Sequence, residues 1–186
     1  MDGAKAAGVV PDGAGPRTDD SGPCTLTAFG PSPARRERLE RVHVIRQLVE
    51  EDWDQWKPLW ASYLDFYRAT LSEETSLNTF ERLTRGDGDM FALLAVSEQG
   101  EGAGVVHCVV HPTTWSGRPS CYLEDLFVTP AARGTDLGRR LLHEAKRASV
   151  ERGAERLYWH TQEYNGRARS LYDQVARPTS FIVYEM

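Results

Sequence analysis

The stretch SCYLEDLFVTPAARGTDLGRRLL, residues 120–142, carries the pattern that decides the fold. Its first part reads as a β-strand that Pro130 ends. From residue 137 the apolar side chains recur at helical spacing, and Gly153 is a natural stop for that helix. The sequence therefore predicts a strand over residues 120–128, a turn over 129–136 and a helix over 137–152.

The turn is typical of a phosphate-binding loop. A glycine-containing turn that enters a helix presents free backbone N–H groups and the positive end of the helix dipole, and both favour a phosphate or pyrophosphate. Arg133, Arg139 and Arg140 add positive charge nearby. Ordinary helix capping produces similar turns, so the turn by itself does not decide between the two.

Asp136 stands in this turn where a phosphate-binding loop would carry glycine. Its carboxylate could accept the same N–H groups that a phosphate needs, which would weaken phosphate binding. It could instead point outward and pair with one of the neighbouring arginines at little cost. The sequence leaves both interpretations open.

Hydrophobic periodicity predicts the remaining elements. We expect strands over residues 41–49, 89–96, 104–112, 155–161 and 180–186, and helices over residues 51–70, 75–83 and 166–175. Pro58 interrupts the first of these helices, so a break or kink is expected near Lys57. This order predicts an α/β fold with a mixed sheet and helices on both of its faces.

Composition limits the function classes. The 186 residues suffice for one domain, which we place at residues 35–186, and residues 1–34 are rich in Gly, Pro, Ala and Asp and predict a disordered tail. A net charge of −5 argues against a nucleic-acid-binding domain. The three cysteines lack metal-site spacing, and no apolar run suits a membrane span or a signal peptide. We therefore expect a cytoplasmic protein with no metal, no membrane and no nucleic-acid partner.

Three motifs in order resemble the GNAT superfamily of N-acetyltransferases. They are YLEDLFV at residues 122–128, RGTDLG at 133–138 and NGRARSLYDQV at 165–175. The first resembles spermidine/spermine acetyltransferases, and the WHTQ segment and aromatic helix resemble the branch with D-amino-acid and histone acetyltransferases. The resemblance covers residues 41–186. It implies a mostly antiparallel twisted sheet, acetyl-CoA as co-substrate and a homodimer.

The resemblance also implies roles for individual residues. Glu124 corresponds to the proposed general base and Tyr172 to the acid that protonates the departing CoA thiolate. Backbone N–H groups near Leu126 and Val128 would hold pantetheine and polarise the thioester carbonyl. The residues implied to bind acetyl-CoA are Leu126, Phe127, Val128, Arg133, Gly134, Thr135, Asp136, Leu137, Gly138, Arg139, Asn165 and Ala168.

Fewer signals mark the acceptor site. The aromatic residues of the 51–70 helix are mostly core, but Trp56 or Tyr63 could hold a cation against its ring. Trp115 lies in a loop that could cover the cleft. Asp125 follows Glu124 on a strand, so the two should face opposite ways, with Asp125 as a supporting or substrate-binding group. His107, His111 and His160 lack compact metal spacing and read as core or edge histidines.

The expected function is direct transfer of acetyl from acetyl-CoA to a primary amine of a small molecule, in a ternary complex. Polyamines, amino acids and amine-bearing antibiotics are all open as acceptors. Two alternatives remain, namely a peptide or protein amine as the acceptor and a CoA-binding regulatory protein without activity. Asp136, together with the absence of a glycine before Phe181, motivates the last alternative.

Overall fold

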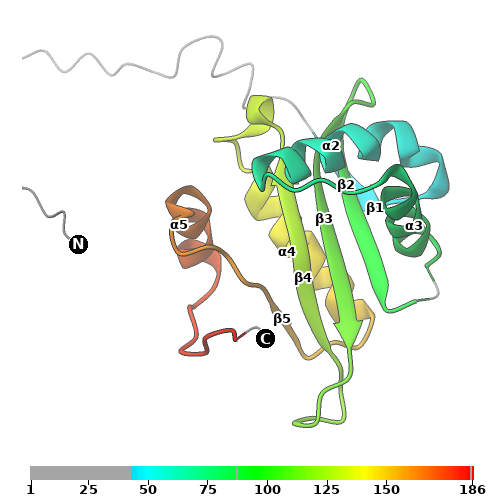
Figure 1. The fold of residues 1–186 in the computed structure, drawn as a ribbon. Coiled ribbons are helices and arrows are strands. Elements are labelled where there is room, and N and C mark those ends of the chain that lie inside the picture. Colours follow the sequence, from blue (N-terminus) through cyan, green and yellow to red (C-terminus); the bar gives the residue numbers. More distant parts are fainter. Residues whose placement is uncertain (1–42, 87, 185) are drawn as a thin grey trace, which may run out of the picture. The chain divides into compact units, whose positions relative to one another are not determined.

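The sheet is mixed and follows the order of the chain (Figure 1). The computed structural model describes residues 43–86, 88–184 and 186, so the tail predicted for residues 1–34 lies outside the described residues. Within them, the strands are β1 (His43–Gln47), β2 (Met90–Ser97), β3 (Gly102–His111), β4 (Ser120–Val128) and β5 (Arg156–Tyr158). β1 to β4 pair antiparallel, and β5 pairs parallel with β4.

Helices cover both faces of the sheet. They are the 3-10 turns η1 (Glu50–Asp52) and η2 (Pro130–Ala132) and the α-helices α2 (Trp53–Phe66), α3 (Glu73–Thr84), α4 (Leu137–Glu151) and α5 (Gly166–Val175). α4 connects β4 to β5, because parallel neighbours need a crossover. The predicted α/β class, with a mostly antiparallel sheet between helices, is confirmed.

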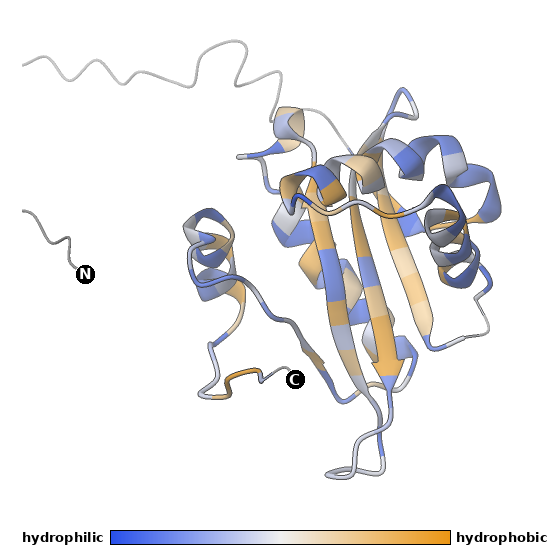
Figure 2. Cartoon of the chain, in the orientation of Figure 1, coloured by the Kyte–Doolittle hydropathy of each residue, from blue (hydrophilic) through white to orange (hydrophobic). Residues whose placement is uncertain are grey.

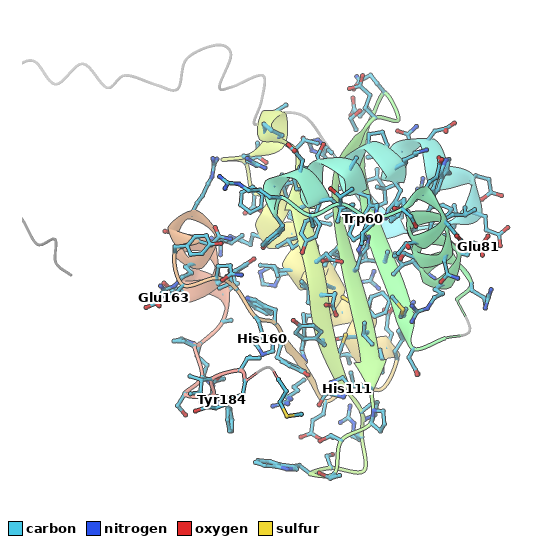
Figure 3. The ribbon with its side chains drawn as sticks, viewed as in Figure 1. Trp60, Glu81, His111, His160, Glu163 and Tyr184 are labelled. Carbon is cyan, nitrogen blue, oxygen red and sulfur yellow. The ribbon has the colours of Figure 1, made fainter. Side chains whose placement is uncertain are left out.

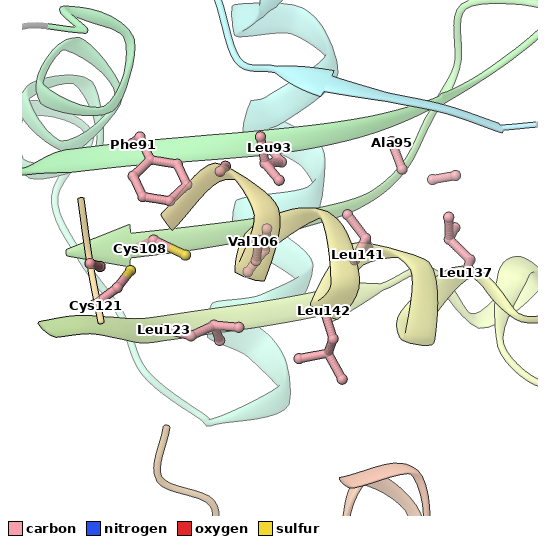
Figure 4. Packing of buried hydrophobic residues seen from close by; sticks show 14 of the residues in the cluster. Phe91, Leu93, Ala95, Val106, Cys108, Cys121, Leu123, Leu137, Leu141 and Leu142 are labelled. Atoms are coloured by element: carbon pink, nitrogen blue, oxygen red, sulfur yellow. The ribbon is translucent and has the colours of Figure 1, made fainter. Parts of the chain in front are cut away.

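Two hydrophobic cores lie on the two faces of the sheet. The apolar side of α4 packs on β2, β3 and β4 in one core, and Figure 4 shows its leucines over Val106 and Leu123. α2 and α3 pack on the other face around Trp56 and Phe127. Figure 2 shows the hydrophobic residues concentrated on the strands between these layers. The central strands are therefore buried on both sides, which explains their long apolar runs.

The break predicted near Lys57 is wrong. α2 is a continuous α-helix from Trp53 to Phe66 with Pro58 inside it. Proline removes one N–H donor from a helix, but the apolar side of α2, with Trp56, Leu59 and Trp60 buried, packs along the sheet. Tertiary packing of this side outweighs the loss of that hydrogen bond.

The last predicted strand is also absent from the described part of its range. Residues 180–184 form neither strand nor helix. Phe181, Ile182, Val183 and Tyr184 are between 60% and 85% exposed. These residues pair with none of the five strands, and a strand needs a partner for its N–H and C=O groups.

Candidate active site

A β-bulge in β4 shapes the centre of the candidate site. His107 of β3 lies opposite Asp125 of β4, whereas the next residue, Cys108, lies opposite Leu123. Glu124 is therefore an extra residue with no partner on β3. A bulge bends its strand and changes the direction of the side chains on it.

The bulge turns both adjacent carboxylates toward α2. Leu123 packs in the core beneath α4, so Glu124, the next residue, takes the opposite face. Asp125 shares that face, because it pairs with His107, which Trp56 of α2 contacts. The expectation that Glu124 and Asp125 face opposite sides is therefore wrong. A regular strand would separate them, and the extra residue brings them together.

β4 and β5 pair over a short length and then part. Only Ser120, Cys121 and Tyr122 of β4 pair with residues of β5. Further along, the Thr129 N–H donates to the Ala103 carbonyl of β3, so the strand alternation directs the N–H groups of Leu126 and Val128 away from β3. The Val128 carbonyl also points to that side, where it accepts a hydrogen bond from Arg133. The open edge thus presents backbone donors beside the two carboxylates.

Aromatic side chains surround the carboxylates. Tyr63 of α2 stacks on Trp60 with ring centroids 5.5 Å apart, and Tyr67 packs on Tyr63 at 4.9 Å. Tyr122 of β4 contacts the ring of His160, which Figure 3 shows on the segment after β5. Burial and then the charge of Asp125 raise the pKa of Tyr63 well above its ordinary value. These phenols are therefore neutral at physiological pH. The tyrosines form an aromatic wall of the site, and Glu124 and Asp125 form its acidic floor.

The carboxylates of Glu124 and Asp125 have different surroundings. Partial desolvation raises the pKa of Glu124 above its ordinary value, and the nearby charge of Asp125 raises it further. Asp125 has a close partner instead, since its Oδ2 lies 2.8 Å from His107 Nδ1, and its charge also acts on the nearby Tyr63 hydroxyl. Pairs of carboxylates with unlike surroundings are a frequent feature of acid–base sites. The structure does bring Glu124, Asp125 and Tyr63 together, as a site requires.

Tyr172 lies on α5, half-buried, with its ring edge-on to Trp159 at 5.2 Å. Burial, with a smaller contribution from Tyr67, raises the pKa of Tyr172 to about 12. The phenol therefore keeps its proton at physiological pH. Tyr67 contributes to the raised pKa of both Tyr122 and Tyr172. Sequence reasoning gave Tyr67 no role, although its spacing of four from Tyr63 placed both on one helix face.

The glycine turn before α4 keeps its donors accessible. Gly134 adopts a positive φ of 81° with open space around its α-carbon. Thr135 Oγ1 accepts the Leu137 N–H at 3.2 Å, which leaves Gly138 and Arg139 as first-turn N–H groups without an intrahelical partner. The Asp136 carboxylate makes no capping hydrogen bond and pairs instead with Arg139 at 3.2 Å. The outward interpretation of Asp136 therefore holds.

α5 lies close to this turn. A Cβ added to Gly138 would meet Leu171 of α5 at 3.1 Å, so glycine permits the close approach of the two helices. The side chain of Asn165 accepts the N–H of Ala168 and caps α5. Asn165 and Ala168, both implied to bind acetyl-CoA, thus lie at the start of the helix that carries Tyr172.

Two expected substrate contacts fall elsewhere. Trp56 is fully buried and donates its indole N–H to His107 Nε2 at 2.9 Å, so its ring cannot line a cleft, and that expectation is wrong. Aromatic residues at helical spacing do not tell which of them is the buried one. Trp115 is 88% exposed in the loop between β3 and β4, at the end of β4 that precedes the bulge. Its role as a cover stays a prediction.

Histidines of the site contact aromatic residues. His111 Nε2 lies 2.9 Å from the Tyr158 hydroxyl, and His160 Nδ1 lies 3.1 Å from that of Tyr122.

Within the described ranges, no group of three or more His, Cys, Asp or Glu side chains is placed to hold a metal ion. The helices of the same ranges include none long and apolar enough to cross a membrane.

The chain is similar to known proteins. The model of the acetyltransferase (GNAT) family matches residues 45–176. The chain is 32% identical to the D-amino-acid N-acetyltransferase HPA3 of Saccharomyces cerevisiae over 143 residues, which cover 76% of this chain and 89% of the relative.

Solved structures share the fold. The aminoglycoside N-acetyltransferase AAC(6')-Iy, in complex with CoA, aligns with a TM-score of 0.69 and 17% identity over 78% of this chain and 95% of its own. A ribosomal-protein-alanine N-acetyltransferase from Brucella melitensis biovar Abortus 2308 aligns with a TM-score of 0.61 and 23% identity over 78% and 98%. Because the sequence identities are this low, the two structures support the fold and nothing about the function.

Proposed function

Because this chain belongs to the acetyltransferase (GNAT) family, we propose that it transfers the acetyl group of acetyl-CoA directly to a primary amine of a small molecule. The observation that carries the proposal is the bulge in β4. It places Glu124 and Asp125 on one face beside the open strand edge, between the tyrosines of α2 and the helix that bears Tyr172. This arrangement supports Glu124 as the base, Asp125 as the carboxylate that binds the amine and Tyr172 as the acid.

The residues of the turn suit the pyrophosphate of acetyl-CoA. The N–H groups of Gly138 and Arg139 at the start of α4 would bind its oxygens, with Arg133 and Arg139 as nearby cations. The pairing of Asp136 with Arg139 leaves these N–H groups uncapped. This weakens the case for a regulatory protein with a damaged site. The backbone donors of Leu126 and Val128 would hold the pantetheine arm along the β4 edge.

The chemistry assigned to Glu124 is proton removal. A primary amine is mostly protonated at pH 7 and must lose a proton before it attacks a thioester. The raised pKa of Glu124 makes it a better base than an ordinary carboxylate. A water molecule between the amine and Glu124 would serve equally well.

Tyr172 and the strand edge act on the other reactant. The N–H groups of the open β4 edge stabilise negative charge that develops on the carbonyl oxygen of the thioester. The phenol of Tyr172 stays protonated and donates to the sulfur as the C–S bond breaks. Direct transfer needs no protein nucleophile, and Cys108 and Cys121 are both buried in the core. Holding the two reactants in one complex supplies much of the acceleration.

Small amines are the acceptors that the relatives favour. HPA3 is named for D-amino acids, and a shorter match, 33% identical over 60 residues, is the thialysine N-epsilon-acetyltransferase of Bos taurus. The acidic floor and tyrosine wall suit a cationic amine by charge and by cation–π contact. A peptide or protein amine is the alternative acceptor, and the screen described below distinguishes it from a small amine.

A homodimer in the cytoplasm completes the proposal. The exposed apolar residues Phe181, Ile182 and Val183 form a patch that association would cover. The free cysteines Cys108 and Cys121 suit a reducing compartment. Sedimentation of the full chain, compared with a chain that ends at residue 179, tests the dimer. Equal masses for the two would remove the C-terminal segment from the interface.

Calorimetric titration with acetyl-CoA, followed by a thiol-release screen over amines, tests the function. We expect micromolar binding and release of CoA thiol with at least one small amine. Failure to bind acetyl-CoA would overturn the enzymatic proposal. Binding without thiol release from any small amine, but with release from peptides, would favour a protein acceptor.

A further inference from the structure

Asp125 is a nearly buried carboxylate without a cationic partner. Its side chain is 13% exposed, and no arginine or lysine of the described chain pairs with it. Its charge raises the pKa of the phenols Tyr63, Tyr67 and Tyr122 and that of the neighbouring carboxyl group of Glu124, and none of these groups is a cation. A buried carboxylate without a compensating cation is costly for a fold to keep. Such groups gather at functional sites.

The hydrogen bonds around His107 fix the form of its ring. The indole of Trp56 can only donate, so His107 Nε2, which lies 2.9 Å from it, must be the acceptor. The proton of the neutral ring therefore sits on Nδ1, which donates to Asp125 Oδ2 at 2.8 Å. A doubly protonated ring would set an N–H against the indole N–H. His107, itself 2% exposed, thus orients Asp125 without neutralising it.

We propose that His107 is a positioning residue for the acceptor: Trp56 fixes its neutral form, and its Nδ1–H holds the Asp125 carboxylate in place to bind the acceptor's ammonium group. The inference rests on the proposed function, because it concerns the acceptor side of the same site. Tyr63 lies close enough to Asp125 for the carboxylate charge to raise the pKa of its phenol, so it belongs to the same group of side chains. The substrate class that follows is a cationic amine whose charge completes the site.

Two substitutions of His107 separate positioning from packing. The amide nitrogen of asparagine can occupy the place of Nδ1, whereas that of glutamine reaches the place of Nε2. We expect His107→Asn to keep the KM for the amine within about threefold, and His107→Gln and His107→Leu to raise it about tenfold or more. The acetyl-CoA affinity should stay unchanged in all of them. A packing role predicts the reverse order, since asparagine leaves the larger cavity.

The form of the ring can be measured without turnover. In the full chain labelled with ¹⁵N, the nitrogen resonances of His107 should be those of a neutral ring protonated at Nδ1, at pH 7.5. Titration with 1,4-diaminobutane should shift the His107 Nδ1–H resonance in the wild type but not in Asp125→Asn. A ring protonated at Nε2, or no shift with the diamine, would overturn the inference. If no amine is acetylated, the proposed function fails while these two measurements still decide the role of His107.

Discussion

Asp136 forms an ion pair with Arg139, with 3.2 Å between Oδ1 and Nε, and its carboxylate leaves the start of α4 uncapped. Its side chain is 65% exposed, so this pair is weak, but it removes the competitor for the helix N–H groups. We expect Asp136→Gly to change the acetyl-CoA dissociation constant by less than about threefold, which titration calorimetry measures. Asp136→Asn, which keeps the size and removes the charge, is the control. A tenfold gain in affinity for Asp136→Gly alone would return the carboxylate to the phosphate site.

Glu124→Gln should lower kcat/KM by about 10²- to 10⁴-fold, because glutamine cannot accept the proton of the amine. In the wild type, activity should rise with pH through the pKa of Glu124, which burial and the charge of Asp125 raise above its ordinary value. The variant should lose this acid limb of the pH–rate profile. If the variant retains the same limb, the base is another group.

Glu124→Gln should lower activity, but it should not lower the stability of the fold. The folded-state pKa of Glu124 is raised, so its ionisation disfavours folding, and its contribution to stability is lost as pH rises through that pKa. We therefore expect Glu124→Gln to unfold at an equal or higher urea concentration than the wild type at pH 7. Glu98→Gln, on an exposed turn, is the control and should have no effect. A clear loss of stability would mean that Glu124 has a structural partner.

Tyr172→Phe should reduce kcat about a hundredfold with little change in acetyl-CoA affinity, because only the donor hydroxyl is removed. The ring and its contact with Trp159 remain. Since the pKa of Tyr172 is about 12, no loss of activity from its ionisation is expected below about pH 11. Single-turnover kinetics with saturating acetyl-CoA measure the chemical step. An unchanged rate would remove Tyr172 from catalysis.

Asp52→Asn should lower the free energy of unfolding at pH 7 by about 2 kcal/mol. Both carboxylate oxygens of Asp52 accept hydrogen bonds from Arg46, at 2.5 and 2.6 Å, and one accepts the Val49 N–H. The Arg46 hydrogen bonds hold the pKa of Asp52 below its ordinary value. This stabilisation is present above the ordinary pKa of an aspartate in the unfolded chain and is lost as pH falls through the lowered pKa.

Urea unfolding at pH 7 and pH 3 checks this prediction. The difference between wild type and Asp52→Asn should shrink at the lower pH. Glu73→Gln, which breaks the exposed pair with Lys57, is the matched control and should change stability little at either pH. A pH-independent difference would show that packing, not charge, explains the loss.

Local patterns predicted most of the elements. The helix expected over residues 166–175 is α5, and that expected over 137–152 ends one residue earlier in the structure, at Glu151. The family was also readable, because its three motifs are short runs of neighbouring residues. The predictions from local sequence were wrong where tertiary packing outweighs a local preference. Pro58 was read as a break, yet α2 continues through it on the surface of the sheet.

The sequence alone determined the order of elements, the glycine turn before α4 and the residue types of the site. Only the tertiary structure decided the directions of Glu124 and Asp125. Their shared face follows from the register of β4 on β3, and pairing between strands, not spacing along one strand, sets a register. The partner of Asp125 is likewise a distant one. His107, read as a core or edge histidine, lies 18 residues away in the chain and meets Asp125 only because β3 and β4 pair.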